Sequence, residues 1–143
     1  MILVDSSVLI DHFRGTTNPQ TEQLRRWLSG LDGPPDLGVA DLVVFEVVRG
    51  FATAKEQARA RDLLLALEVV EIGGLSNALH AAALYQRLRQ QGRTVRSPVD
   101  VLLASYCMAH GHVLLHRDAD FESLKGLGGL DTCLLYTSDA ADE

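Results

Sequence analysis

The chain has 143 residues, 47% of them hydrophobic, and a formal net charge of −6 at pH 7. This length suits one domain with a buried core, and the acidic balance argues against a protein that holds nucleic acid by charge alone. The apolar runs are too short to span a membrane, and Met1 leads into a predicted strand without the basic start of a signal peptide. We therefore expect a cytoplasmic protein, in which Cys107 and Cys133 are reduced thiols.

The first apolar run ends at a carboxylate. Residues 2–4 read Ile-Leu-Val without polar alternation, which predicts a strand buried on both faces of a parallel sheet. Asp5 follows directly, and ligands of open α/β sheets bind at the carboxyl ends of strands. Asp5 or Ser6 could also simply cap the helix predicted over residues 7–14. The role of Asp5 depends on which other acids lie beside it.

Capping residues, glycines and prolines divide the middle of the chain into predicted elements. These are a helix ending at residue 28, a strand over 37–40, a helix over 42–50 capped by Asp41, a helix over 54–67, a strand over 69–72, and a helix that Ser76 caps and Gly92 ends. Glu46 lies among apolar residues of the third helix, where a charge persists only if it faces a site or finds a partner. A place on the exposed stripe of that helix is the alternative.

A further helix begins at Ser97, Pro98 and Asp100. Serine, proline and an acid at these positions fit a capping box, which is a purely structural role for Asp100. The stretch before it holds four arginines and no acid, which could contact RNA phosphates or an acidic partner, or could form a solvated face. These arginines are Arg87, Arg89, Arg93 and Arg96.

The fourth predicted strand, over residues 113–115, also ends in acids. Asp118 follows it at the same level of the sheet as Asp5. The alternating acids after this strand are spaced as in a calcium loop, but Ser123 and Gly129 occupy the positions of its glycine and bidentate glutamate, which excludes that site. The histidines show no zinc-ligand spacing.

The order of these elements predicts a three-layer α/β/α domain with a mostly parallel sheet of four to five strands. Asp5 and Asp118 then share one edge of the sheet, which Glu46 and Asp100 can also reach. Four carboxylates in one cleft repel each other unless a divalent cation lies among them. Oxygen ligands favour Mg²⁺ or Mn²⁺ over zinc.

Four segments in order, MILVDSSVLIDHFRG, FEVVRG, SPVDVLLASYCMAHG and LLHRDADFE, resemble PIN-domain ribonuclease toxins of the VapC type over residues 1 to about 132. The resemblance implies a five-stranded parallel sheet and a catalytic metal site with one or two Mg²⁺ ions (Mn²⁺ as the alternative) for hydrolysis of RNA phosphodiesters. It assigns the metal to Asp5, Glu46, Asp100 and Asp118, with Ser7 and Asp120 as auxiliary residues.

The resemblance also implies partners: an RNA substrate, a VapB-like antitoxin and a second copy of the chain in a homodimer. The candidate RNA contacts are Arg49, Arg93, Arg96 and Arg117. His116 stands where many relatives carry threonine, serine or asparagine.

Two other functions compete with this one. A catalytically silent PIN domain that binds RNA or a partner would be indicated by loss of one of the four acids, and none is lost. A phosphatase with Asp5 as nucleophile expects a second aspartate two residues later, where this chain has Ser7.

The last eleven residues, CLLYTSDAADE, resemble the translated read-through of a sequencing adapter. We therefore expect the PIN domain to comprise residues 1–132 and residues 133–143 to be non-native. Without the three acids of this segment, the net charge changes from −6 to −3.

Overall fold

The computed structural model describes residues 1–95, 97–119, 121, 124 and 129–133. The strands are β1 (Ile2–Val4), β2 (Leu37–Ala40), β3 (Glu68–Val70), β4 (Val113–Leu115) and β5 (Asp131–Thr132). The helices are α1 (Ser6–Phe13), α2 (Pro19–Leu28), α3 (Asp41–Val48), α4 (Ala54–Leu65), α5 (Leu75–Gln90) and α6 (Pro98–His110). None of the helices in the described ranges is long and apolar enough to cross a membrane.

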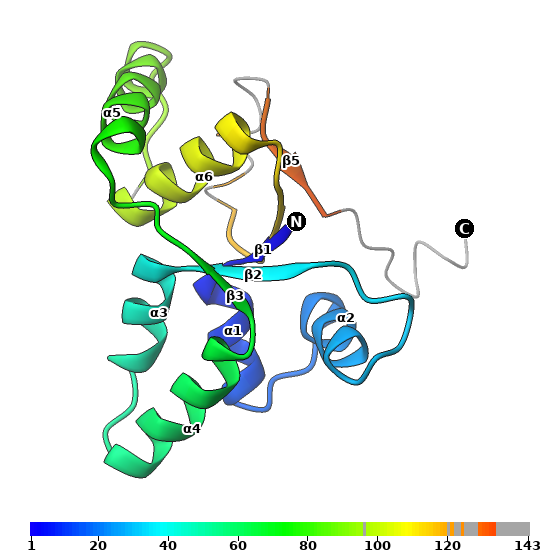
Figure 1. Ribbon diagram of the computed structural model, residues 1–143. Helices are drawn as coiled ribbons and strands as arrows, with labels where there is room; N and C mark the ends of the chain where they lie inside the picture. The colour runs from blue at the N-terminus through cyan, green and yellow to red at the C-terminus, as the bar shows by residue number, and fades with distance from the viewer. Residues whose placement is uncertain (96, 120, 122–123, 125–128, 134–143) are drawn as a thin grey trace.

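The strands form one parallel sheet in the order β3-β2-β1-β4-β5. Leu3 in the central strand lies opposite Gly38 on one side and Leu114 on the other. Helices α1 to α4 lie on one side of the sheet and α5 and α6 on the other (Figure 1). The predicted three-layer α/β/α domain is confirmed, and the sheet has five strands.

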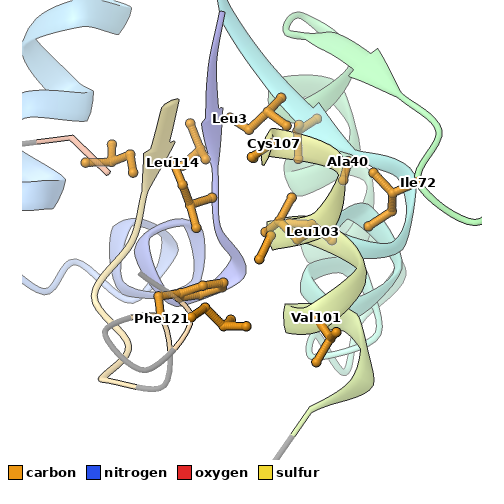
Figure 2. Packing of buried hydrophobic residues seen from close by; sticks show 14 of the residues in the cluster. Leu3, Ala40, Ile72, Val101, Leu103, Cys107, Leu114 and Phe121 are labelled. Atoms are coloured by element: carbon orange, nitrogen blue, oxygen red, sulfur yellow. The ribbon is translucent and has the colours of Figure 1, made fainter. Parts of the chain in front are cut away.

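The core forms where the helices meet the central strands. Leu3 and Leu114 are fully buried, and Leu103 and Cys107 of α6 pack against the sheet (Figure 2). Strand β1 carries apolar side chains on both of its faces, as expected for a strand inside a parallel sheet. Cys107 is 1% exposed, so this thiol is a small core residue.

Two predicted helix caps are wrong. Helix α3 begins at Asp41 itself, and the Asp41 carboxylate accepts hydrogen bonds from the backbone N–H groups of Leu42 and Ile72, both at 2.9 Å. Asp41 thus ties α3 to the segment that follows β3. Ser76 lies in the first turn of α5, whose N-cap residue is Gly74 without a side-chain cap.

Some boundaries also differ from those predicted. The third strand covers 68–70 and not 69–72, because the chain leaves the sheet before Ile72, which is nevertheless fully buried. Helix α1 begins one residue early, at Ser6, and α4 ends at Leu65 and not at residue 67. Of the predicted read-through segment, only Cys133 lies within the described residues.

Candidate acidic site at the carboxyl edge of the sheet

Asp5 is both a helix cap and a buried acid. It follows β1 directly, and its backbone N–H donates to the carbonyl of Leu115, which ends β4. Its Oδ2 accepts hydrogen bonds from the backbone N–H of Ser7 at 3.0 Å and from the Ser7 hydroxyl at 2.6 Å. The residue is only 1% exposed, and its Oδ1 is buried without a hydrogen-bond partner. Capping therefore occupies one oxygen of Asp5 and leaves the other available to a ligand.

Glu46 lies close enough to Asp5 for the two charges to interact. It is half-buried in α3, and its Oε1 is a second buried oxygen without a hydrogen-bond partner. Burial raises the pKa of Glu46, and the nearby charge on Asp5 raises it further, while a hydrogen bond from the Ser6 side chain lowers it. The structure thus brings together two acids that are 41 positions apart in the sequence.

The environment of this pair disfavours negative charge. Burial also raises the pKa of Asp5, although the hydrogen bonds from Ser7 and the neighbouring His116 oppose that shift. A buried carboxylate oxygen without a donor loses its hydration and receives nothing in exchange. A cation beside Asp5 Oδ1 and Glu46 Oε1 would compensate both charges.

Asp100 reaches the same end of the domain from the opposite layer. It lies in the first turn of α6 and is 5% exposed. Ser97 makes no side-chain capping bond, so the capping box that could have explained Asp100 is not formed. Because α6 leads back to the start of β4, its first turn lies toward the carboxyl edge of the sheet. Figure 2 accordingly shows Val101 and Phe121 at the same end of the buried cluster.

Asp118 lies three residues beyond β4 and is half-buried. Its backbone N–H donates to Nδ1 of His116 at 3.3 Å, so the imidazole supports this segment. The backbone N–H of Arg117 donates to the Ser7 hydroxyl at 3.0 Å, which attaches the segment to α1. Ser7, predicted as an auxiliary residue, therefore contacts both Asp5 and the segment that carries Asp118.

The four predicted ligands do not form a complete set here. Within the described part of the chain, no group of three or more Asp, Glu, His or Cys side chains is arranged to hold a metal ion. Asp5 and Glu46 are together, whereas Asp100 and Asp118 approach from α6 and from the segment after β4. The auxiliary residue Asp120 lies outside the described residues.

The candidate RNA contacts lie on different elements. Arg49 is exposed at the end of α3, with its guanidinium 5.3 Å from the centre of the Phe45 ring. Arg93 follows α5 and is half-buried, and Arg117 follows β4 with about half of its side chain exposed. Arg96 lies outside the described residues.

Sequence reasoning missed two polar contacts of this site. The Ser6 side chain lowers the pKa of Glu46, and Asp11 accepts a hydrogen bond from Arg117 Nε at 2.8 Å. Asp11 lies 106 positions from its partner, and nothing in the local sequence pattern indicates this pairing.

Fold and site together define an α/β domain with buried acids at the carboxyl edge of a parallel sheet. The PIN domain family matches residues 2–127, and the chain belongs to that family. Ribonuclease VapC11 of Mycobacterium tuberculosis is 28% identical over 130 residues, which cover 91% of this chain and 96% of the relative. The resemblance expected from the four sequence segments is thereby confirmed.

Solved structures share the fold. VapBC2 from Rickettsia felis, bound to a DNA fragment from its promoter, matches with a TM-score of 0.71 at 16% identity, over 93% of this chain and 98% of that one. VapC20 of Mycobacterium tuberculosis, a toxin that cleaves the sarcin-ricin loop, matches with a TM-score of 0.67 at 15% identity, over 95% of this chain and all of the other.

Proposed function

We propose that this protein is a metal-dependent endoribonuclease and the toxin of a type II toxin–antitoxin pair. The observation that carries the proposal is the pair of buried, unpartnered oxygens, Asp5 Oδ1 and Glu46 Oε1, at the carboxyl edge of the sheet. Similarity to ribonuclease VapC11 over nearly the whole chain supports RNA as the substrate.

The donor chemistry of four carboxylates suits a divalent cation, although in this structure only Asp5 and Glu46 offer buried oxygens without a hydrogen-bond partner. Asp5 and Glu46 would hold it, joined by Asp100 from α6 and Asp118 from the segment after β4. Because all four ligands are carboxylates, Mg²⁺ is the expected ion and Mn²⁺ the alternative. When bound, such an ion supplies electrophilic stabilisation of the phosphodiester and lowers the pKa of a water molecule.

The protein's own residues orient the reacting groups and accept a proton. The Ser7 hydroxyl donates to Asp5 Oδ2 and so fixes the rotation of the carboxylate, which leaves Oδ1 for the ligand. Burial and the charge on Asp5 raise the pKa of Glu46 in the metal-free protein, and a carboxylate with a raised pKa is a stronger base. Glu46 is therefore our candidate for the group that orients the attacking water and accepts its proton.

Incubation of the purified protein with total RNA tests this function. We expect cleavage with Mg²⁺, no cleavage with excess EDTA, and no cleavage by the Asp5→Asn variant at any Mg²⁺ concentration. RNA binding without cleavage by the wild-type protein would contradict the proposal and favour a binding module.

We further propose a VapB-like antitoxin partner in the cytoplasm, because several similar structures are VapBC complexes. Co-expression with the small protein encoded next to this gene tests that partner. We expect the two chains to co-purify and RNA cleavage to fall, whereas separate elution with unchanged cleavage would contradict the proposal.

A homodimer is the third part of the proposal. Leu75 and Leu79 on α5 are 76% and 64% exposed, and Tyr85 on the same helix is 40% exposed. Beside them, a hollow between α5 and α6 is lined by Ala82, Tyr85 and Leu102. An exposed apolar face of this kind is typical of a subunit interface.

A further inference from the structure

Arg117 joins the segment after β4 to helix α1 at two points. Its backbone N–H donates to the Ser7 hydroxyl at 3.0 Å, and its side-chain Nε donates to Asp11 Oδ2 at 2.8 Å. Ser7 and Asp11 are four residues apart on α1, so their side chains lie on the same face of the helix. One residue of the segment is thus held by both its backbone and its side chain.

The Asp11 carboxylate that binds this guanidinium is itself held in place. Its side chain is only 14% exposed, and its Oδ2 also accepts a hydrogen bond at 3.1 Å from Nδ2 of Asn18, the cap of α2. A partly buried carboxylate held by a second donor has few alternative orientations. The ion pair of Arg26 and Asp32 differs, since its side chains are 53% and 37% exposed.

The chain of hydrogen bonds continues into the acidic site. The Ser7 hydroxyl accepts from the Arg117 backbone and donates its own proton to Asp5 Oδ2 at 2.6 Å. The position of residue 117 is therefore coupled to the rotation of the Asp5 carboxylate. Asp118 is the next residue along the chain and is positioned by the same attachment.

We propose that Asp11 is a positioning residue of the acidic site. By holding Arg117, it fixes the segment that carries Asp118 against α1 and keeps the Ser7 hydroxyl directed at Asp5. This inference rests on the proposed function. It predicts that loss of Asp11 impairs metal binding and turnover even though Asp11 is not a ligand, as outer-shell changes at metal sites do by about 10- to 100-fold.

A double-mutant cycle on Asp11→Ala and Arg117→Ala tests the inference. We expect the Mn²⁺ dissociation constant, measured by titration calorimetry, to rise about tenfold in Asp11→Ala, and kcat for RNA cleavage to fall by about 10- to 100-fold. Because both residues act through one contact, the double variant should bind Mn²⁺ no more weakly than the worse single variant. The Asp11→Asn variant, which keeps an acceptor oxygen, should recover part of the loss.

The matched control is the exposed pair. Arg26→Ala, Asp32→Ala and their double variant should leave Mn²⁺ binding and cleavage unchanged, because this ion pair lies apart from the acidic site. If Asp11→Ala does not fold, the Mn²⁺ dissociation constant of Arg117→Ala makes the test, since this variant leaves the bond between Asp11 and Asn18 intact and Mn²⁺ binding does not depend on an RNA contact.

Two failures are distinguishable. A wild-type protein that neither binds Mn²⁺ nor cleaves RNA would overturn the proposed function. A wild-type protein that does both, with Mn²⁺ affinity and kcat unchanged in Asp11→Ala, or with fully additive losses in the cycle, would overturn the role of Asp11 alone.

Discussion

Glu46 of α3 and Asp5 at the end of β1 lie close enough for the charge on Asp5 to raise the pKa of Glu46, beyond the larger effect of burial. Each acid keeps one buried oxygen without a hydrogen-bond partner. Two carboxylates in this arrangement are costly in the metal-free protein. A cation bound between the two carboxylates would compensate this cost.

Replacement of Asp5 by asparagine separates function from folding. We expect Asp5→Asn to lower RNA cleavage by more than about 100-fold, because even outer-shell changes at metal sites cost about 10- to 100-fold. The variant loses a buried charge, so the thermal midpoint of the metal-free protein should stay the same or rise. Cleavage assays and thermal unfolding in EDTA measure the two effects. A marked fall in the thermal midpoint would instead assign Asp5 a mainly structural role.

The stability of the metal-free protein should depend on pH through the same pair. The folded-state pKa values of Asp5 and Glu46 lie above their ordinary values of 3.8 and 4.5. Between the ordinary and raised values the folded state binds more protons than the unfolded state, so the free energy of unfolding falls as pH rises. Denaturant unfolding in EDTA from pH 4 to 8 measures this fall.

The matched control for that experiment is the double variant Asp5→Asn, Glu46→Gln. Subtracting its profile removes the contributions of the other titrating groups, such as His12 and His112, whose pKa values are lowered by burial. The wild type should lose stability relative to this variant as pH rises. Parallel profiles would contradict raised pKa values for this pair.

The exposed apolar face of α5 predicts that the protein is a homodimer. We expect Leu79→Glu to convert a dimer into a monomer of 15.6 kDa, because a charge at the centre of an apolar interface is not compensated. Light scattering after size exclusion measures the mass. Leu65→Glu is the control, since Leu65 is 59% exposed on α4 and should tolerate the change. Equal masses for both variants would contradict an interface on α5.

Cys107 should resist alkylation in the folded protein. Burial, with a smaller effect from the charge on Asp5, raises the pKa of its thiol from 9.0 to about 12. A shift of this size lowers the thiolate fraction by about 1,000-fold near neutral pH, and the buried position blocks access as well. Mass spectrometry after iodoacetamide treatment should find Cys107 modified only in denaturant. Rapid native labelling would mean that the core around α6 opens.

The fold was largely predictable because its strands are short apolar runs that end in turns or acids. Residues 2–4 and 113–115 were predicted within the bounds that the structure has, and their parallel pairing follows from the helices between them. Caps were less predictable. The carboxylate of Asp41 accepts a hydrogen bond from the backbone N–H of Ile72, 31 positions away, and no local sequence pattern predicts this contact.

The site was predictable only as an arrangement of acids along one edge of the sheet. Glu46 is anomalous in an apolar helix, and in the structure it lies near enough to Asp5 for the two charges to interact. The contacts of Ser7 and Asp11 with Arg117 depend on how the segment after β4 folds back on α1. Side-chain placement of that kind follows from tertiary packing and not from spacing in the sequence.

Titration of the wild-type protein with Mn²⁺, beside the Asp5→Asn and Glu46→Gln variants, tests the central claim most directly. Calorimetry should show saturable binding to the wild type, loss of that binding in Asp5→Asn and a clear weakening in Glu46→Gln. Unchanged binding in both variants, or no binding to a folded wild-type protein, would contradict a cation site built on these two carboxylates.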